Sequence, residues 1–406
     1  MFLDAIERRN PDLIRATVAL HQEGQIPPNT VVFDLDTVVA NAEKIKQRAR
    51  ALGLKLYFMT KQISRNPLIA QRIVDRGVPQ TVCVEVDCAR QLFRSGVMIG
   101  HVGNLVQIPT GELKSVLRMR PEVMTVHTLR KAEQVSQVAQ RLGIVQDLLV
   151  RVRNDGDVFL AGMEAGVHLD QLPSVARHML ALPSVRLVGV STFPALYYKV
   201  ERRAVEPTPN FQSALRGAEI LLEAGAQVTQ INTPGNTSTV TLETFARLGS
   251  THVEPGHGFL GTTPLHLTED LPEVPASVYL SEVAHTVGGY AYSHGGGHFI
   301  DDRQWAPPGW ERTAMVGDDP DSIFDNRVPF VGTGPRETGG QGFLDYHGVL
   351  DPQGRRAEVG DSVIFGFRVQ SFATRANTAV IGGIQSGSPQ LLGVWDCAAN
   401  RRHQLP

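Results

Sequence analysis

The sequence predicts an α/β fold: a (β/α)8 TIM-type barrel followed by a C-terminal all-β domain. Two observations predict the barrel. Short β-rich runs alternate with amphipathic helical stretches, and eight such runs occur over roughly 200 residues. A third observation predicts the all-β domain, because helical periodicity ends past Pro264 and Gly- and Pro-rich turns replace it. An open doubly wound sheet would show the same alternation, so the count of eight favours the barrel.

Residues 1–36 form the expected N-terminal leader and first strand, which we expect to pack with the β domain. A short helical segment ends at Pro27, and residues 31–36 (VVFDLD) are typical of a strand. A helix is expected to follow as far as Ala49, because apolar side chains recur there at helical spacing.

Residues 37–268 form the predicted barrel. Its eight β-rich runs are LYFMT (56–60), TVCVEV (81–86), VMIGHVG (97–103), VMTVHT (123–128), LLVRVR (148–153), LVGVSTF (187–193), QVTQINT (227–233) and THVEPG (251–256). Helical stretches between them, such as residues 128–143, end in Gly in the manner of a helix C-cap.

Residues 269–406 form the predicted C-terminal β domain. Turn-forming clusters of Gly and Pro increase there, and short alternating runs appear, such as residues 361–369 (DSVIFGFRV) and 377–384 (NTAVIGGI). This change in sequence character places the domain boundary near residue 268.

The composition excludes several classes of protein. The 406-residue chain has 42% hydrophobic and 20% charged residues, which excludes disorder as its main state. A net charge of −2, without blocks of like charge, argues against general electrostatic binding to nucleic acid or to a membrane. We expect no signal peptide and no membrane span, because the first residues lack an apolar region and the sequence has no run of 18 apolar residues. The three cysteines fit a reducing compartment. We therefore expect a cytoplasmic protein.

The C-terminal ends of the predicted strands should form the functional face of the barrel. Polar residues at these ends are Lys61, Asp87, His101, Asn104, His127, Arg151, Arg153, Ser191, Thr192, residues 232–239 and residues 254–257. Lys61 is the most unusual, because it closes an apolar strand where an ammonium group is costly to desolvate. Its free amine would be available for imine formation; the alternative is a lysine that extends from the rim into solvent.

Two further segments at the predicted mouth point to a phosphate and a carboxylate. Residues 232–240 (NTPGNTSTV) combine hydroxyl side chains with Gly before an expected helix, which favours an anion cradle over an ordinary capping turn. Glu254, in EPGHG, would place a carboxylate in the mouth, although a surface salt bridge is the alternative. An imine-forming lysine, a phosphate cradle and a carboxylate around one pocket together describe an aldehyde cofactor with a phosphate and a basic ring nitrogen.

These residues resemble a known family. Residues 32–62 (VFDLDTVVANAEKIKQRARALGLKLYFMTKQ) resemble the opening of the alanine racemase-like, fold type III pyridoxal phosphate enzymes, and the strings MTKQ, LVQIP, PTPN and EPGH are closest to the YhfX group of that superfamily. The resemblance implies that Lys61 carries pyridoxal 5′-phosphate as a Schiff base. The cofactor-binding residues that we expect are Lys61, Arg65, Thr192, Asn232, Thr233, Gly235, Asn236, Thr237, Glu254, Gly256 and His257.

Glu254 is the main departure from the alanine racemase pattern. It falls where those enzymes carry an Arg that contacts the pyridine nitrogen, whereas the ornithine decarboxylase branch carries Glu there. An Arg cannot accept a proton, so it keeps that nitrogen neutral. A carboxylate keeps the nitrogen protonated and makes the ring a strong electron sink, which suits racemisation but also decarboxylation, aldol cleavage or β-elimination.

A second acid/base is implied by residues 289–298 (GYAYSHGGGH). In alanine racemases a Tyr from the partner subunit faces the lysine across the substrate, and the counterpart here is His294 or Tyr292. This arrangement implies a homodimer with shared active sites. The alternative is that both side chains simply alternate outward on a strand.

Weaker signals concern the substrate and a metal. Arg153, Arg368 and Gln370 could bind the carboxylate of an amino acid substrate. His285, His298 and residues 345–347 contain metal-ligand types without a diagnostic spacing, so we expect no metal. The sequence thus favours an amino acid racemase. The alternatives are a lyase, aldolase or decarboxylase with the same cofactor, a non-catalytic protein that binds pyridoxal phosphate, and a sugar-phosphate barrel without cofactor.

Overall fold

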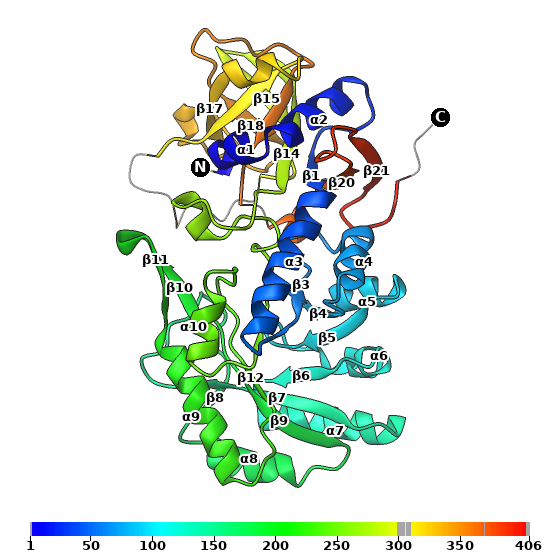
Figure 1. The fold of residues 1–406 in the computed structure, drawn as a ribbon, viewed down its shortest axis with the longest axis vertical. Helices are drawn as coiled ribbons and strands as arrows, with labels where there is room; N and C mark the ends of the chain where they lie inside the picture. The colour runs from blue at the N-terminus through cyan, green and yellow to red at the C-terminus, as the bar shows by residue number, and fades with distance from the viewer. Residues whose placement is uncertain (1, 299–304, 306–309, 369, 403–406) are drawn as a thin grey trace. The chain divides into compact units, whose positions relative to one another are not determined.

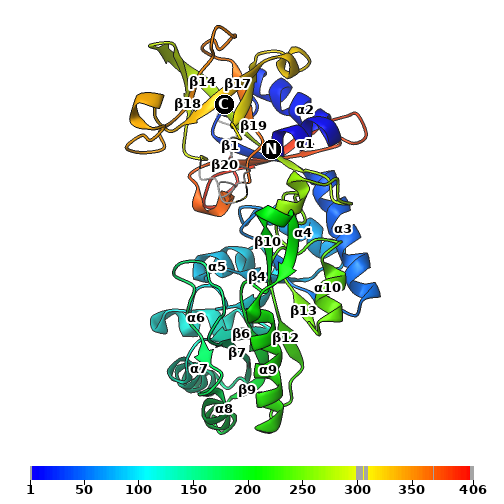
Figure 2. The ribbon, with the colours of Figure 1, turned by 90° about the vertical axis from the view of Figure 1, so that its left-hand side faces the viewer.

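The computed structural model of the chain describes residues 2–298, 305, 310–368 and 370–402. The chain forms two compact units. One comprises Met1–Ala42, Gln62–Ile69 and Phe259–Pro406, and the other comprises Glu43–Lys61 and Ala70–Gly258 (Figures 1 and 2). We call them the β unit and the barrel unit. These divisions follow Ala42 and Gly258, whereas the sequence predicts boundaries after residues 36 and 268, and Gln62–Ile69 is grouped with the β unit.

The barrel unit contains a nearly closed sheet of nine consecutive parallel strands, and a tenth strand pairs with one of them off this path. The alternating pattern predicted such a barrel from its eight β-rich runs. In sheet order the strands are β2 (Lys55–Leu56), β13 (His252–Val253), β12 (Gln230–Asn232), β9 (Val185–Ser191), β7 (Gln146–Arg153), β6 (Val123–Val126), β5 (Met98–Val102), β4 (Gln80–Cys83) and β3 (Phe58–Met59). β2 and β3 are two halves of one segment, interrupted at Tyr57. The first half pairs with β13 and the second with β4, so this segment closes the ring.

Helices connect the barrel strands, and Figure 1 shows α5, α6 and α7 outside them. The helices are α3 (Leu35–Ala51), α4 (Pro67–Asp75), α5 (Val86–Arg94), α6 (Leu113–Arg118), α7 (Leu129–Leu142), α8 (Leu172–Leu180), α9 (Pro209–Glu223) and α10 (Leu242–Arg247). Local sequence sets their ends. Thr128 caps α7 by accepting a hydrogen bond from the Lys131 N–H, and Gly143 ends it with φ 66°.

Shorter elements complete the barrel unit. They are β8 (Val167–His168), the hairpin of β10 (Leu196–Lys199) and β11 (Ala204–Pro207), and the 3-10 turns at Thr110–Glu112 and Val200–Arg202. Gly189 lets β9 approach β12, because a Cβ there would lie 1.8 Å from the Gln230 carbonyl oxygen. Buried apolar side chains form one cluster with Tyr57: Met59, Val82, Val84, Val123 and Leu149.

The β unit is built on a second, mainly antiparallel sheet. In sheet order its strands are β15 (Tyr290–His294), β18 (His347–Leu350), β17 (Arg327–Gly332), β16 (Thr313–Gly317), β19 (Ser362–Phe365), β14 (Ser277–Val287), β1 (Thr30–Asp34), β20 (Asn377–Gly382) and β21 (Gln390–Trp395). β15 also pairs with β14, which closes part of the sheet into a barrel. The predicted all-β domain is thereby confirmed.

The N-terminal leader belongs to this β unit. β1 pairs antiparallel with β14 and parallel with β20, and α1 (Phe2–Arg9) and α2 (Pro11–Gln22) lie beside it in Figure 2. Their apolar faces join the main core of the unit through Phe2, Ile6 and Leu13. The remaining 3-10 turns are Pro264–Leu267, Ser322–Asp325, Arg336–Thr338 and Ser371–Ala373. No helix in the described part of the chain is long and apolar enough to cross a bilayer.

Candidate active site

The polar residues predicted for the barrel mouth lie at or just beyond the C-terminal ends of its strands. Lys61 follows β3 directly after Thr60, and its side chain is half-buried while Thr60 is fully buried. Glu254 follows β13, and Asn232 ends β12. Parallel strands bring these ends to one edge of the sheet, so residues distant in sequence become neighbours there.

A buried cluster of three side chains forms around the carboxylate of Glu254. Its Oε1 atom lies 2.6 Å from Nδ1 of His101, which belongs to β5. Asn232 donates its Nδ2–H to the same oxygen at 2.9 Å, and this nitrogen lies 3.1 Å from His101 Nδ1. His101 and Asn232 are fully buried and Glu254 is nearly so, which makes these contacts much stronger than the same contacts in water.

The other ring nitrogen of His101 begins a chain of hydroxyl groups. Nε2 lies 2.6 Å from Oγ1 of Thr125, which donates to Ser191 Oγ at 3.3 Å. Ser191 in turn donates to Oδ1 of Asn104 at 3.1 Å. These side chains come from or directly follow strands β5, β6 and β9, so the chain of contacts spans the barrel interior from Glu254 to Asn104.

Arg151, on β7, is a fully buried cation beside this chain. Its guanidinium donates to three backbone carbonyls, those of Asn104 (2.6 Å), Met163 (2.8 Å) and Phe193 (3.4 Å), and no carboxylate of the described chain pairs with it. Burial lowers the pKa of Arg151 to about 10. A buried cation held only by carbonyl groups is an attractive position for a ligand anion.

His127 lies on the other side of Asn104. Its Nε2–H donates to the Asn104 carbonyl at 3.1 Å. Burial and then the charge of Arg151 lower its pKa to about 4, so the imidazole is neutral at physiological pH. Arg151 therefore contributes a fixed positive charge to the mouth, whereas His127 contributes none.

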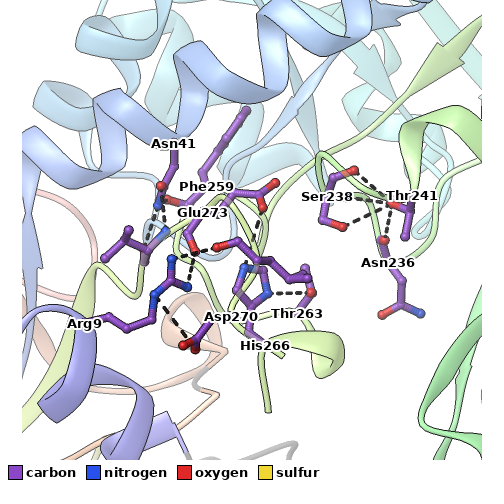
Figure 3. Close-up of polar contacts among 12 residues, drawn as sticks. Arg9, Asn41, Asn236, Ser238, Thr241, Phe259, Thr263, His266, Asp270 and Glu273 are labelled. Carbon is purple, nitrogen blue, oxygen red and sulfur yellow. Dashed lines mark hydrogen bonds and ion pairs between the residues drawn. The ribbon is translucent and has the colours of Figure 1, made fainter. Parts of the chain in front are cut away.

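The loop after β12 carries the predicted phosphate-binding residues. Gly235 (φ 152°) lies so close to the backbone that a Cβ would be 2.7 Å from the Leu196 carbonyl oxygen, to which Asn236 donates its Nδ2–H at 3.1 Å. Figure 3 shows the Thr241 hydroxyl donating to the Asn236 carbonyl, at 2.9 Å. The helix α10 begins only at Leu242, so the loop itself, and not a helix start, would have to supply the backbone donors.

Two buried hydroxyl groups at this mouth have no hydrogen-bond partner within the described structure: Oγ1 of Thr192 and Oγ1 of Thr237. Thr233 is also buried, and its hydroxyl is hydrogen bonded to that of Ser250. The loop after β13 packs tightly here, because a Cβ on Gly258 would lie 2.5 Å from the Thr237 carbonyl oxygen. Unsatisfied buried hydroxyls are rare in folded proteins, and they fit a ligand that supplies acceptor oxygens, such as a phosphate.

Comparison with known proteins gives this geometry a family context. Residues 33–264 match the family model "Alanine racemase, N-terminal domain", and residues 278–391 match "YhfX-like, C-terminal domain". The curated Escherichia coli (strain K12) protein "Uncharacterized protein YhfX" is 34% identical over 400 residues, which cover 98% of this chain and 99% of that protein. The chain belongs to the alanine racemase-like, fold type III family.

Solved structures support the same fold. D-threonine aldolase from Filomicrobium marinum gives a TM-score of 0.66 at 16% identity, over 91% of this chain and 94% of its own. D-threo-3-hydroxyaspartate dehydratase from Delftia sp. HT23 gives a TM-score of 0.62 at 18% identity, over 89% of this chain and 96% of its own. Alanine racemase from Clostridium difficile 630 gives a TM-score of 0.61 at 15% identity, over 92% of this chain and 99% of its own. Members of this fold family thus include a racemase, an aldolase and a dehydratase, so the family leaves the reaction open.

The remaining predicted residues divide between the two units. Gly256 and His257 are buried after β13, and Arg153 is half-buried at the end of β7. Arg65 belongs to the β unit, within a turn where both it and Ser64 have positive φ (58° and 52°). Its guanidinium donates to the Cys397 carbonyl at 3.1 Å. Left-handed backbone at two consecutive non-Gly residues is strained, which is frequent next to functional sites.

The predicted substrate and acid/base residues of the C-terminal domain also lie in the β unit. Arg368 is half-buried and donates its Nε–H to the Thr262 carbonyl at 3.2 Å, and Gln370 is half-buried. On β15 Tyr292 is half-buried and stacks on His285 with ring centroids 4.6 Å apart, whereas His294 is exposed. Among the described residues, no three His, Cys, Asp or Glu side chains are grouped as a metal site would require.

The sequence alone does not indicate a role for the hydrogen-bonded chain from His101 to Arg151. The polar strand-end residues include its members His101, Asn104, Arg151 and Ser191, but no known sequence motif contains them. The usable signal was the position of His101 inside the apolar run MIGHV, where an unpaired imidazole would be costly.

Proposed function

We propose that the chain binds pyridoxal phosphate through Lys61 and acts at Cα of an amino acid, as an amino acid racemase. The observation that carries the proposal is the buried polar mouth. The strand ends bring four groups to this mouth: the Glu254 carboxylate, the Arg151 cation, the Thr192 hydroxyl without a partner in the described structure, and Lys61. When bound, this cofactor withdraws electrons from Cα of an attached amino acid and so acidifies the Cα proton.

We assign the phosphate to the loop after β12 and its neighbours. The residues are Asn232, Thr233, Gly235, Asn236 and Thr237, with Thr192, Gly256, His257 and Arg65. Two of them, Thr192 and Thr237, have buried hydroxyls that need an acceptor. Glu254 would accept a hydrogen bond from the N–H of a protonated ring nitrogen, because a carboxylate favours the protonated form of such a nitrogen where an Arg would oppose it.

We assign proton transfer at Cα to Lys61 on one face of the substrate. His294 or Tyr292 of the partner subunit would serve the opposite face, which requires a homodimer. Both side chains lie on β15, and the half-buried Tyr292 is held in place by its stacking on His285. The substrate carboxylate would bind Arg153, Arg368 or Gln370. A positioned acid or base contributes roughly 10²- to 10⁴-fold, so losing Tyr292 should slow racemisation without always abolishing it.

Cofactor attachment is tested by adding pyridoxal phosphate to the purified protein and recording its absorbance. We expect a yellow lysine-bound form that Lys61→Ala eliminates. Lys55→Ala is the matched control, because Lys55 is an exposed lysine at the start of the same barrel segment. If the wild-type protein gains no yellow form, the proposal fails.

The reaction is tested with pools of L- and D-amino acids in D₂O, followed by mass spectrometry and chiral separation. Racemisation predicts deuterium at Cα together with interconversion of the enantiomers. Deuterium in only one enantiomer, with retention of configuration, would contradict it. Tight cofactor binding without turnover of any amino acid would instead indicate a non-catalytic binding protein.

One observation favours a second candidate, a lyase or aldolase with the same cofactor. A carboxylate at Glu254, where the alanine racemases that this chain resembles carry an Arg, makes a bound ring a stronger electron sink than racemisation needs. That electronic arrangement also suits cleavage of a Cα–Cβ bond or loss of a β-substituent. Release of an aldehyde or a 2-oxo acid from the same amino acid pools would identify this reaction, or the decarboxylation alternative if CO₂ is released.

A further inference from the structure

We infer that His101 is a positioning residue for Glu254, and that the two side chains share one proton held in place by the hydroxyl chain of Thr125 and Ser191. The shared proton follows from the contacts in the barrel unit alone. Its use toward a ring nitrogen rests on the proposed function.

The acceptor at the end of the hydroxyl chain fixes the direction of every hydrogen bond in it. Oδ1 of Asn104 can only accept, so the Ser191 hydroxyl donates to it. Ser191 Oγ therefore accepts from the Thr125 hydroxyl. Thr125 Oγ1 has then used its only proton, so it must accept from Nε2–H of His101 across their 2.6 Å contact. The Nε2 atom of His101 consequently carries a proton.

A second proton is required between His101 and Glu254. Nδ1 and Oε1 are 2.6 Å apart, and two bare lone pairs would repel at that distance. Because Nε2 already has its proton, the pair holds one proton more than a neutral imidazole beside a free carboxylate. The pair is therefore neutral overall, whichever of the two atoms is closer to the shared proton.

Burial gives a physical reason for this arrangement. An isolated carboxylate as buried as Glu254 would be expensive, and a neutral pair with a charge-assisted hydrogen bond lowers that cost. The Asn232 Nδ2–H, 2.9 Å from Oε1, fixes the orientation of the carboxylate from a second direction. The carboxyl group of Glu254 therefore has a fixed orientation, and the proton that it shares with His101 can be transferred to a basic nitrogen.

The first test uses the cofactor-free protein with ¹⁵N-labelled histidine. Nitrogen shifts and proton couplings should show a protonated Nε2 at His101 and a strongly downfield proton between Nδ1 and Glu254. Glu254→Gln should abolish that downfield signal. Glu273→Gln is the matched control, because Glu273 is a second buried glutamate beside a histidine, and it should leave the signal in place. An unprotonated Nε2 in the wild-type protein would overturn the inference without any variant.

The second test uses the conservative variants of His101. Asparagine keeps a donor near the position of Nδ1, and glutamine keeps one near Nε2, but neither can share a proton with Glu254. In protein loaded with pyridoxal phosphate, both variants should shift the pH at which the bound cofactor changes its absorbance. The same midpoint as in the wild type would contradict the positioning role. Failure of the wild type to bind cofactor would instead contradict the proposed function. It would not affect the result obtained with the cofactor-free protein.

Discussion

Among the described residues, two histidine–glutamate pairs have both side chains buried, and they differ in the contacts that the imidazole makes. In the barrel unit both ring nitrogens of His101 have partners at 2.6 Å, Glu254 and Thr125. In the β unit His266 Nδ1 is 2.7 Å from the Thr263 hydroxyl, but its Nε2 lies 3.8 Å from Glu273 Oε2, beyond hydrogen-bond distance (Figure 3).

The two distances correspond to two roles of a buried His–Glu pair, one in packing and one in a polar network. Burial, followed by the charge of Arg9, lowers the pKa of His266 to about 3, so this imidazole is neutral. Arg9 contacts the backbone carbonyls of Leu271 and Glu273 at 2.7 and 2.9 Å, which ties α1 to this segment. The His266 pair is therefore part of the packing of the β unit, whereas the His101 pair lies at the barrel mouth within a continuous polar network. Burial does not distinguish the two pairs; the distance between imidazole and carboxylate, 2.6 Å in one pair and 3.8 Å in the other, does.

The largest difference between the two pairs should appear in activity when the carboxylates are neutralised. Glu254→Gln keeps the shape of the side chain but cannot hold a proton for a ring nitrogen, so we expect turnover of the amino acid substrate to fall by about 10²- to 10³-fold. Glu273→Gln should leave turnover unchanged and alter only stability. Steady-state kinetics together with the unfolding free energy of each variant checks this, and equal losses of turnover would contradict the assignment.

The barrel and part of the mouth could be predicted from sequence because their signals are local. Two strand ends are marked by residues next to them in the sequence: one by the apolar run that ends at Lys61, the other by the Gly-rich turn after Glu254. The contact of His101 with Glu254 could not be predicted, because 153 residues separate them and only closure of the barrel brings them together. The grouping of Gln62–Ile69 with the β unit was missed as well, because no periodicity or turn signal in that segment indicates it.

Acidification should destabilise the β unit through His266. Its pKa in the folded state, about 3, lies below the usual value of 6.5, so below pH 6.5 the unfolded chain binds a proton that the folded chain excludes. The stability contributed by the neutral imidazole is full above that pH and is lost as the pH falls toward 3. Such a shift corresponds to at most about 5 kcal/mol.

The measurement is the free energy of unfolding by urea at a series of pH values. His266→Asn, which keeps a donor near Nδ1 for Thr263, should show a shallower decline between pH 6.5 and pH 4 than the wild type. Other buried histidines, such as His252 with a pKa of about 3, contribute the slope that remains. Identical slopes for variant and wild type would show that His266 is not held neutral.

The smallest expected effect, and the sharpest test of the comparison, comes from the two threonines that contact these imidazoles. Thr125→Val and Thr263→Val each remove one hydroxyl–imidazole hydrogen bond, of 2.6 and 2.7 Å, with little change in volume. Each should lower the free energy of unfolding by about 1 kcal/mol, since a buried ring nitrogen loses its partner. Only Thr125→Val should also change the pH dependence of turnover, because only His101 is joined to the carboxylate of Glu254. A change in that pH dependence with Thr263→Val, or none with Thr125→Val, would remove the distinction between the two pairs.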